Sequence, residues 1–171
     1  MKKSFSTIAI ATVFLALVGC GKSEAEKARE AAQLKFSEKV AAIKICTQGS
    51  TYSEFRQAEL DLRTSYEVNK ANLENIHDKF SVLDECMAAT DTCWSYSISD
   101  PKTPCFPAAD WQGKLWKSLQ FLSPVIAKKS KYNLGQIEAD PDFFPKNYVQ
   151  TGLTKVSSQA EDLLNLLQKQ N

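Results

Sequence analysis

The amino-acid sequence predicts an all-α protein, an antiparallel bundle of about four helices in which the second helix is the longest. Apolar residues recur at steps of three and four in four separate segments, as they do along one face of an α-helix. Gly49 and the prolines of residues 97–108 separate some of these segments. We find no convincing stretch of alternating apolar and polar residues of the kind that forms a half-buried strand.

The first 20 residues have the three parts of a secretion signal. Lys2 and Lys3 give a positive start, residues 8–18 are apolar, and small residues lead to Cys20. As a helix, the 11 residues of the apolar stretch would extend only about 16 Å. A hydrocarbon layer is roughly 30 Å thick, so the leader predicts export rather than a permanent transmembrane helix.

The leader ends in Leu17-Val18-Gly19-Cys20, which resembles the lipobox of bacterial lipoproteins. The resemblance covers only the leader, and it implies a signal peptide of residues 1–19 and acylation of Cys20 with fatty acids such as palmitate. Several acyl chains attach a protein stably to a membrane. Family sorting associates an aspartate after the cysteine with inner-membrane retention, and Gly21 lacks that carboxylate. The resemblance therefore favours the periplasmic face of an outer membrane; the alternative is a simple secretory signal with a coincidental cysteine.

Removal of the first 19 of the 171 residues leaves 152, enough for one helical domain over residues 23–171 behind a tether of residues 20–22. Without Lys2 and Lys3, 19 basic residues face 20 acidic ones, which gives a net charge of −1. Such a balance argues against a nucleic-acid partner.

The first helix is expected to begin at Ser23, because Ser23 and Glu26 have the spacing of a capping box. It should end near Gly49, a residue type that is favoured after a helix. Its apolar stripe consists of Ala28, Ala32, Phe36, Val40 and Ile43.

The second helix has the strongest periodic signal. Ser50, Thr51 and Ser53 offer capping oxygens for its start, and no glycine or proline interrupts the stripe from Phe55 to Met87. The sequence therefore predicts one helix from about residue 52 into the nineties, paired with the first helix as an antiparallel hairpin.

The remaining chain predicts a loop, two further helices and an ordered segment between them. Prolines indicate a loop over residues 97–108, followed by a helix from about residue 108 or 110 that Pro124 should kink or restart, with Ser123 as its cap. Residues 138–146 are expected to form an ordered loop. The last helix should span about residues 149–169, with an apolar stripe of Leu153, Val156, Ala160, Leu163 and Leu167.

Four cysteines follow Cys20. Cys93 and Cys105 flank the proline-rich loop, and we predict a disulfide between them that stabilises the fold by about 2–3 kcal/mol on the chain-entropy model. An unbroken second helix would place Cys86 about 51 Å from Cys46, whereas a disulfide needs Cα atoms within about 7 Å. These two cysteines then remain buried thiols, pair across an antiparallel dimer, or reveal a break in the long helix.

The sequence offers little for catalysis. His77, the only histidine, lies beside the apolar stripe, and no Gly-x-Ser-x-Gly turn presents a nucleophile, so a partly exposed helical histidine is the expected interpretation. Neighbouring carboxylates such as Glu59 with Asp61, or Asp84 with Glu85, point in different directions on a helix and are expected to face solvent. The cysteine spacing does not suit a zinc site, and we expect no metal and no cofactor.

A candidate interaction face lies in the third predicted helix, where no acidic residue occurs between Asp110 and Glu138. The face would suit an acidic partner or anionic lipid headgroups, although a solvated helix whose aromatics contact a neighbouring helix explains the pattern too. Its residues are Lys114, Trp116, Lys117, Phe121, Lys128, Lys129 and Lys131.

These observations favour a membrane-anchored, non-catalytic interaction protein that faces the periplasm and binds a protein partner in the envelope. An immunity protein or inhibitor directed against a toxin or lysozyme, and an accessory subunit of an envelope complex, both fit this class. The alternative is a carrier of a small molecule or lipid inside the bundle, and an enzyme ranks third. Fold-level analogy does not separate them.

Overall fold

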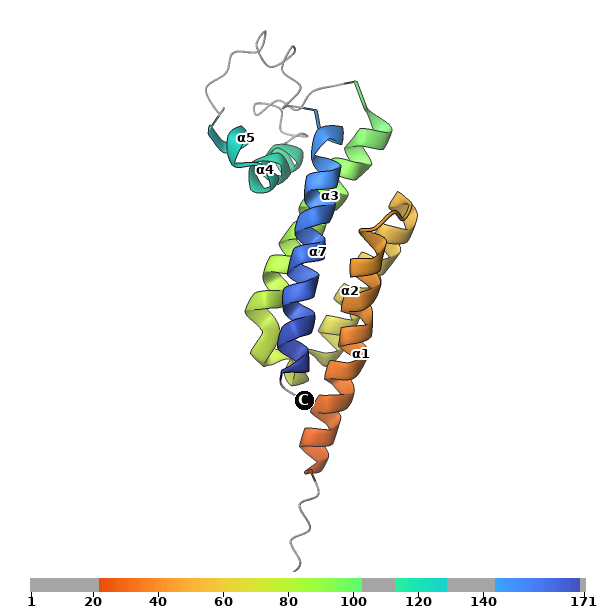
Figure 1. The fold of residues 1–171 in the computed structure, drawn as a ribbon, viewed down its shortest axis with the longest axis vertical. Coiled ribbons are helices and arrows are strands. Elements are labelled where there is room, and N and C mark those ends of the chain that lie inside the picture. The colour runs from red at the N-terminus through yellow and green to blue at the C-terminus, as the bar shows by residue number, and fades with distance from the viewer. Residues whose placement is uncertain (1–21, 103–112, 129–143, 170–171) are drawn as a thin grey trace, which may run out of the picture.

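The computed structural model describes residues 22–102, 113–128 and 144–169 (Figure 1). The described residues contain no strand, and the four long helices run alternately up and down, which confirms the predicted all-α antiparallel bundle. The elements are α1 (Glu24–Cys46), α2 (Tyr52–Asn69), η1 (Lys70–Asn72), η2 (Glu74–Ile76), α3 (His77–Ser99), α4 (Gly113–Leu122), α5 (Pro124–Lys128) and α7 (Lys146–Gln168).

Two capping boxes begin the first hairpin. The Ser23 hydroxyl accepts a hydrogen bond from the Glu26 amide, and the Glu26 carboxylate accepts one from the Ser23 amide at 2.6 Å. Thr51 and Glu54 repeat this exchange at the start of α2. Between the two helices Gly49 has a φ of 136°, which glycine adopts without the strain that a side chain would cause. The predicted boundaries of α1 and the start of α2 are therefore confirmed.

The prediction of one long second helix is wrong. The α-helix ends at Asn69, the chain turns through η1 and η2, and α3 begins at His77 and runs antiparallel to α2 (Figure 1). Leu73 and Ile76 in this turn are fully buried. The apolar stripe continues across the turn because residues within the turn are buried as well. Such a stripe indicates which residues are buried, but it does not indicate the direction of the chain.

The four long helices, which we call the body, share one hydrophobic core. Every one of them contributes buried side chains, among them Phe36, Leu62, Leu83 and Val156. α7 approaches α3 closely at Gly152, where an added Cβ would lie 2.4 Å from the Thr90 hydroxyl oxygen. These two helices pack this closely because Gly152 has no side chain.

The α4–α5 pair packs against α3 and α7 at the end of the body opposite the start of α1 (Figure 1). The two short helices are separated before Pro124, as predicted, and proline suits the first position of α5 because an amide there has no helical partner. The expected start of this region near residue 108 or 110 lies outside the described residues. α7 begins at Lys146, slightly earlier than predicted.

Both the start of α1 and the end of α7 lie at the same end of the body (Figure 1). Among the described residues, no helix combines the length and the apolar composition that crossing a bilayer requires.

Candidate functional site

The structure exposes some residues of the predicted interaction face and buries one of them. Lys114 and Lys117 are exposed on α4, and Phe121 is 39% exposed. Trp116 does not belong to the face: it is only 8% exposed, because it packs with Leu119 and its neighbours in the core beneath α4. The side chain of Lys128, at the end of α5, and residues Lys129 and Lys131 lie outside the described part of the structure.

Two residues outside the predicted face extend this surface. Val125 on α5 is 51% exposed. Lys155 of α7 donates a hydrogen bond of 3.1 Å to the Phe121 carbonyl, and its ammonium lies 5.3 Å from the centre of the Phe121 ring. This is a distance at which a cation and an aromatic face attract each other. We call Lys114, Lys117, Phe121, Val125 and Lys155 the cationic face.

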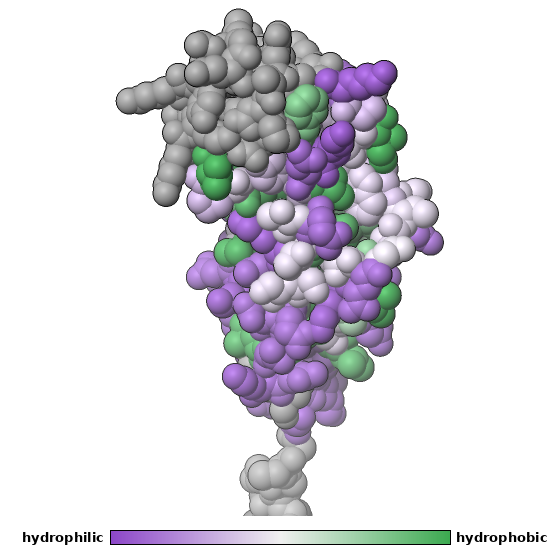
Figure 2. Space-filling view, turned by 45° about the horizontal axis from the view of Figure 1, so that its top comes forward, coloured by the Kyte–Doolittle hydropathy of each residue, from purple (hydrophilic) through white to green (hydrophobic). Residues whose placement is uncertain are grey.

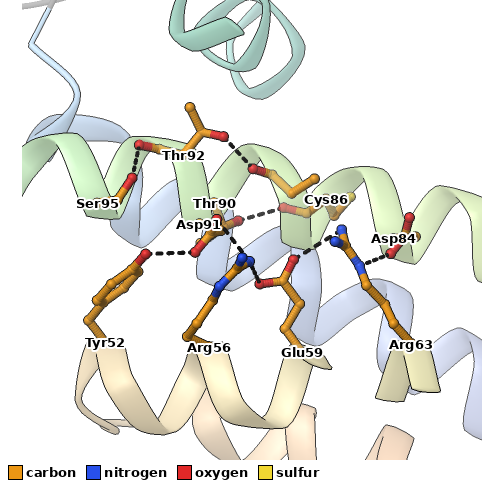
Figure 3. A network of polar contacts seen from close by, with 11 residues as sticks. Tyr52, Arg56, Glu59, Arg63, Asp84, Cys86, Thr90, Asp91, Thr92 and Ser95 are labelled. Atoms are coloured by element: carbon orange, nitrogen blue, oxygen red, sulfur yellow. Dashed lines mark hydrogen bonds and ion pairs between the residues drawn. The ribbon is translucent and has the colours of Figure 1, made fainter. Parts of the chain in front are cut away.

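A second polar arrangement joins α2 to α3 along one side of the body (Figure 3). Arg63 donates to Asp84 at 2.6 Å, and Arg56 lies 3.1 Å from Asp91. Tyr52 donates to the same Asp91 carboxylate at 2.9 Å. The two arginines are seven residues apart on α2, and their partners are seven apart on α3 in the opposite direction, so the two ion pairs match only one antiparallel register.

Glu59 lies between the two arginines and is fully buried (Figure 3). One carboxylate oxygen accepts a hydrogen bond of 2.8 Å from Arg56, and the other lies 3.0 Å from Arg63 in an ion pair without hydrogen-bond geometry. Burial raises the pKa of Glu59, and the Arg56 hydrogen bond opposes that rise. The expectation that Glu59 faces solvent is therefore wrong.

We call these residues the polar seam. It consists of Tyr52, Arg56, Glu59, Arg63, Asp84 and Asp91. Its carboxylates are all paired with the two guanidinium groups, which cannot be deprotonated in a protein. The seam therefore joins α2 to α3 through hydrogen bonds and ion pairs between charged groups.

His77 begins α3 and is exposed, as predicted. Its Nδ1 atom lies 2.7 Å from the Tyr66 hydroxyl, and the two rings are stacked. Burial, together with the Glu67 and Glu74 carboxylates, raises the pKa of Tyr66. In the described part of the chain, the hydrogen-bond partner of His77 is thus a phenol and not a serine or cysteine nucleophile.

The cysteines are placed only in part. Cys46 is a half-buried thiol and Cys86 a buried one, and burial raises the pKa of the Cys86 thiol. Although α3 folds back against α2, Cys46 and Cys86 therefore form no disulfide with each other. Cys93 is buried in α3 beneath α4, while Cys105 lies outside the described residues, so their disulfide stays a prediction. Cys20 lies outside them as well.

Among residues 22–102, 113–128 and 144–169, no group of three or more histidine, cysteine or acidic side chains is arranged to hold a metal ion. No protein-family model matches the chain, and comparisons with curated proteins and with solved structures found no similar protein. The interpretation of the site therefore depends on the residues described above.

Proposed function

We propose that this chain is a lipid-anchored, non-catalytic interaction protein on the periplasmic face of a bacterial outer membrane. The observation that carries the proposal is the sequence Leu17-Val18-Gly19-Cys20 directly before the bundle. Acylation of Cys20 would fix the protein at a bilayer with only two residues between the lipid and Ser23, where the α1 capping box begins.

The arrangement of the bundle supports this proposal. A tether at Cys20 places the start of α1 and the end of α7 nearest the bilayer and the α4–α5 pair farthest from it (Figure 1). On the face drawn in Figure 2, hydrophilic residues gather along the half of the body near the tether. Such a surface suits a domain that stands on a membrane without entering it.

The polar groups of the body also support a non-catalytic role. Asp84, Asp91 and Glu59 are held by arginines between two helices, and His77 is hydrogen-bonded to Tyr66. An acid–base catalyst needs a titratable group that can reach the substrate and whose own pKa lies near the working pH. Immunity proteins, inhibitors and accessory subunits need only a shaped surface.

The test of this proposal is metabolic labelling with a palmitate analogue in cells that express the full chain or its Cys20→Ser variant. We expect the label to enter the full chain and to be absent from the variant, which should leave the membrane fraction. A full chain that takes up no label, or a variant that fractionates as before, would refute the proposal.

A further inference from the structure

The exposed side of the α4–α5 pair has a defined shape before any partner binds. Lys114, Lys117, Phe121 and Val125 follow one another at steps of three and four, on the side opposite the buried residues. The buried side, which packs towards α3 and α7, consists of Leu115, Trp116, Leu119, Leu122 and Ile126. A surface held in place by its own core loses little conformational entropy on binding.

Within the described residues, no acidic side chain neutralises the charges of this surface. Lys114 and Lys117 make no ion pair in the part of the chain that the structure describes, and α4 and α5 contain no acidic residue. Lys155 adds a third cation from α7. The cationic face is therefore electrostatically complementary to a carboxylate-rich surface.

Apolar area lies among these cations. Phe121 and Val125 are 39% and 51% exposed. Aromatic residues surrounded by polar groups are common at the centres of protein interfaces. A partner that covered both side chains would remove apolar surface from water and bring its carboxylates to the lysines.

We infer that the cationic face docks an acidic segment of a second envelope protein, one that also carries an apolar side chain for Phe121 and Val125. The inference rests on the proposed function, because Cys20 sets which end is tethered. α1 alone is 23 residues long, or about 34 Å, whereas surface charges act over a Debye length of about 8–10 Å. With the body standing upright on this anchor, the headgroups of the anchoring membrane are too far away to be the ligand.

The experiment is site-specific photo-crosslinking of the full-length lipoprotein in intact cells. A photoreactive amino acid replaces Val125, with the same substitution at Leu34, which is 61% exposed on α1, as the control position. We expect a protein adduct of one discrete mass from position 125 and none of that mass from position 34. Sequencing of the crosslinked peptide should find a segment that contains several aspartate or glutamate residues.

Charge reversal tests the recognition itself. Lys114→Glu with Lys117→Glu should lower the yield of the adduct at least about fivefold. The matched control is Lys35→Glu with Lys79→Glu, two exposed lysines that also make no ion pair among the described residues. The control should leave the yield unchanged. Replacing the acidic residues of the crosslinked peptide with lysine should restore the adduct of the Glu variant.

Three results would overturn the inference: an adduct that is insensitive to the Lys114 and Lys117 reversals, an adduct with lipid alone, or no adduct from a protein that carries the palmitate label normally. Palmitate labelling of the same cells separates these results from a failure of the proposed function, in which Cys20 takes up no label.

Discussion

Seven of the nine basic side chains between Lys22 and Lys70 make ion pairs, whereas Lys114 and Lys117 on α4 make none in the described part of the chain. In α1 and α2 these pairs join helix to helix or lie within a single helix. On α4 the lysines point away from the protein and surround exposed apolar side chains. The comparison teaches that α1 and α2 use most of their positive charges to fix the geometry of the body, while the α4–α5 pair leaves its charges available to another molecule.

Among these predictions, a substitution at Gly152 should disturb the packing of the body most. Gly152→Ala should lower the free energy of unfolding by about 2–3 kcal/mol, since the new methyl group would meet both Oγ1 and Cβ of Thr90, and overpacking a core costs about this much. Chemical denaturation followed by circular dichroism measures the effect. The control is Gly113→Ala, whose added Cβ has nothing within 4 Å. Equal stability of the two variants would contradict the close approach.

The polar seam is the next target. Arg63→Met should lower the free energy of unfolding by about 2 kcal/mol, because the buried Glu59 carboxylate loses one of its two cations while Asp84 loses its hydrogen bond. Arg29→Met removes an exposed arginine that makes no ion pair among the described residues, and it should have little effect. If both variants unfold at the same denaturant concentration, the seam does not hold α2 to α3.

Glu59→Gln tests the cost of the buried charge. At pH 7 its free energy of unfolding should lie within about 1 kcal/mol of the unchanged protein, because Arg56 and Arg63 keep their partners on α3. The pKa of Glu59 is raised in the folded state, so the folded protein binds the proton more tightly than the unfolded chain. Ionisation of Glu59 therefore removes stability as the pH rises from about 4.3, the unfolded value, through the raised folded pKa.

The measurement for this variant is unfolding by urea over a series of pH values. The stability of Glu59→Gln relative to the unchanged protein should increase as the pH rises through that window and then stay constant. A relative stability that decreases over the same window would mean that the arginines lower the pKa of Glu59 more than burial raises it.

The smallest expected effect comes from charge reversal of lysines, which compares the paired lysines of α1 with the unpaired lysines of α4. Lys39→Glu with Lys44→Glu should lower the thermal midpoint by about 2–4 °C, because it places like charges beside Asp61 and Glu161. Lys114→Glu with Lys117→Glu should change it by less than about 1 °C, since no described ion pair is lost. Differential scanning calorimetry distinguishes the two results, and equal shifts would contradict the comparison.

Local signals predicted most of the fold. The capping boxes at Ser23 and Thr51, the glycine at position 49 and the proline at position 124 each act within a few residues, and each predicted a helix boundary that the structure has. The turn between α2 and α3 was missed because it contains no glycine or proline. The available signal was a spacing of three between Asn69, Asn72 and Asn75, since asparagine is a weak helix former.

The candidate site was harder to predict because its parts come from different helices. Lys114, Lys117 and Phe121 followed from the charge pattern of one segment, whereas Lys155 lies on α7 and reaches Phe121 only in the folded chain. Glu59 is a similar case: its spacing from the arginines is visible in the sequence, but its burial depends on α3 folding back against α2. Trp116 was placed wrongly, because periodicity alone does not indicate how wide the buried side of α4 is.

An even number of long helices has a practical consequence for the design of fusion proteins. Because α7 descends beside α1 (Figure 1), a tag or reporter joined after Gln168 would emerge near the start of α1, beside the lipid that we propose at Cys20, and would leave the cationic face uncovered. With the proposed anchor, a probe of the compartment beyond the bilayer would instead belong in the connection between α3 and α7. Length changes in that connection alter what the protein presents to its surroundings without changing the pairing of α1 with α2.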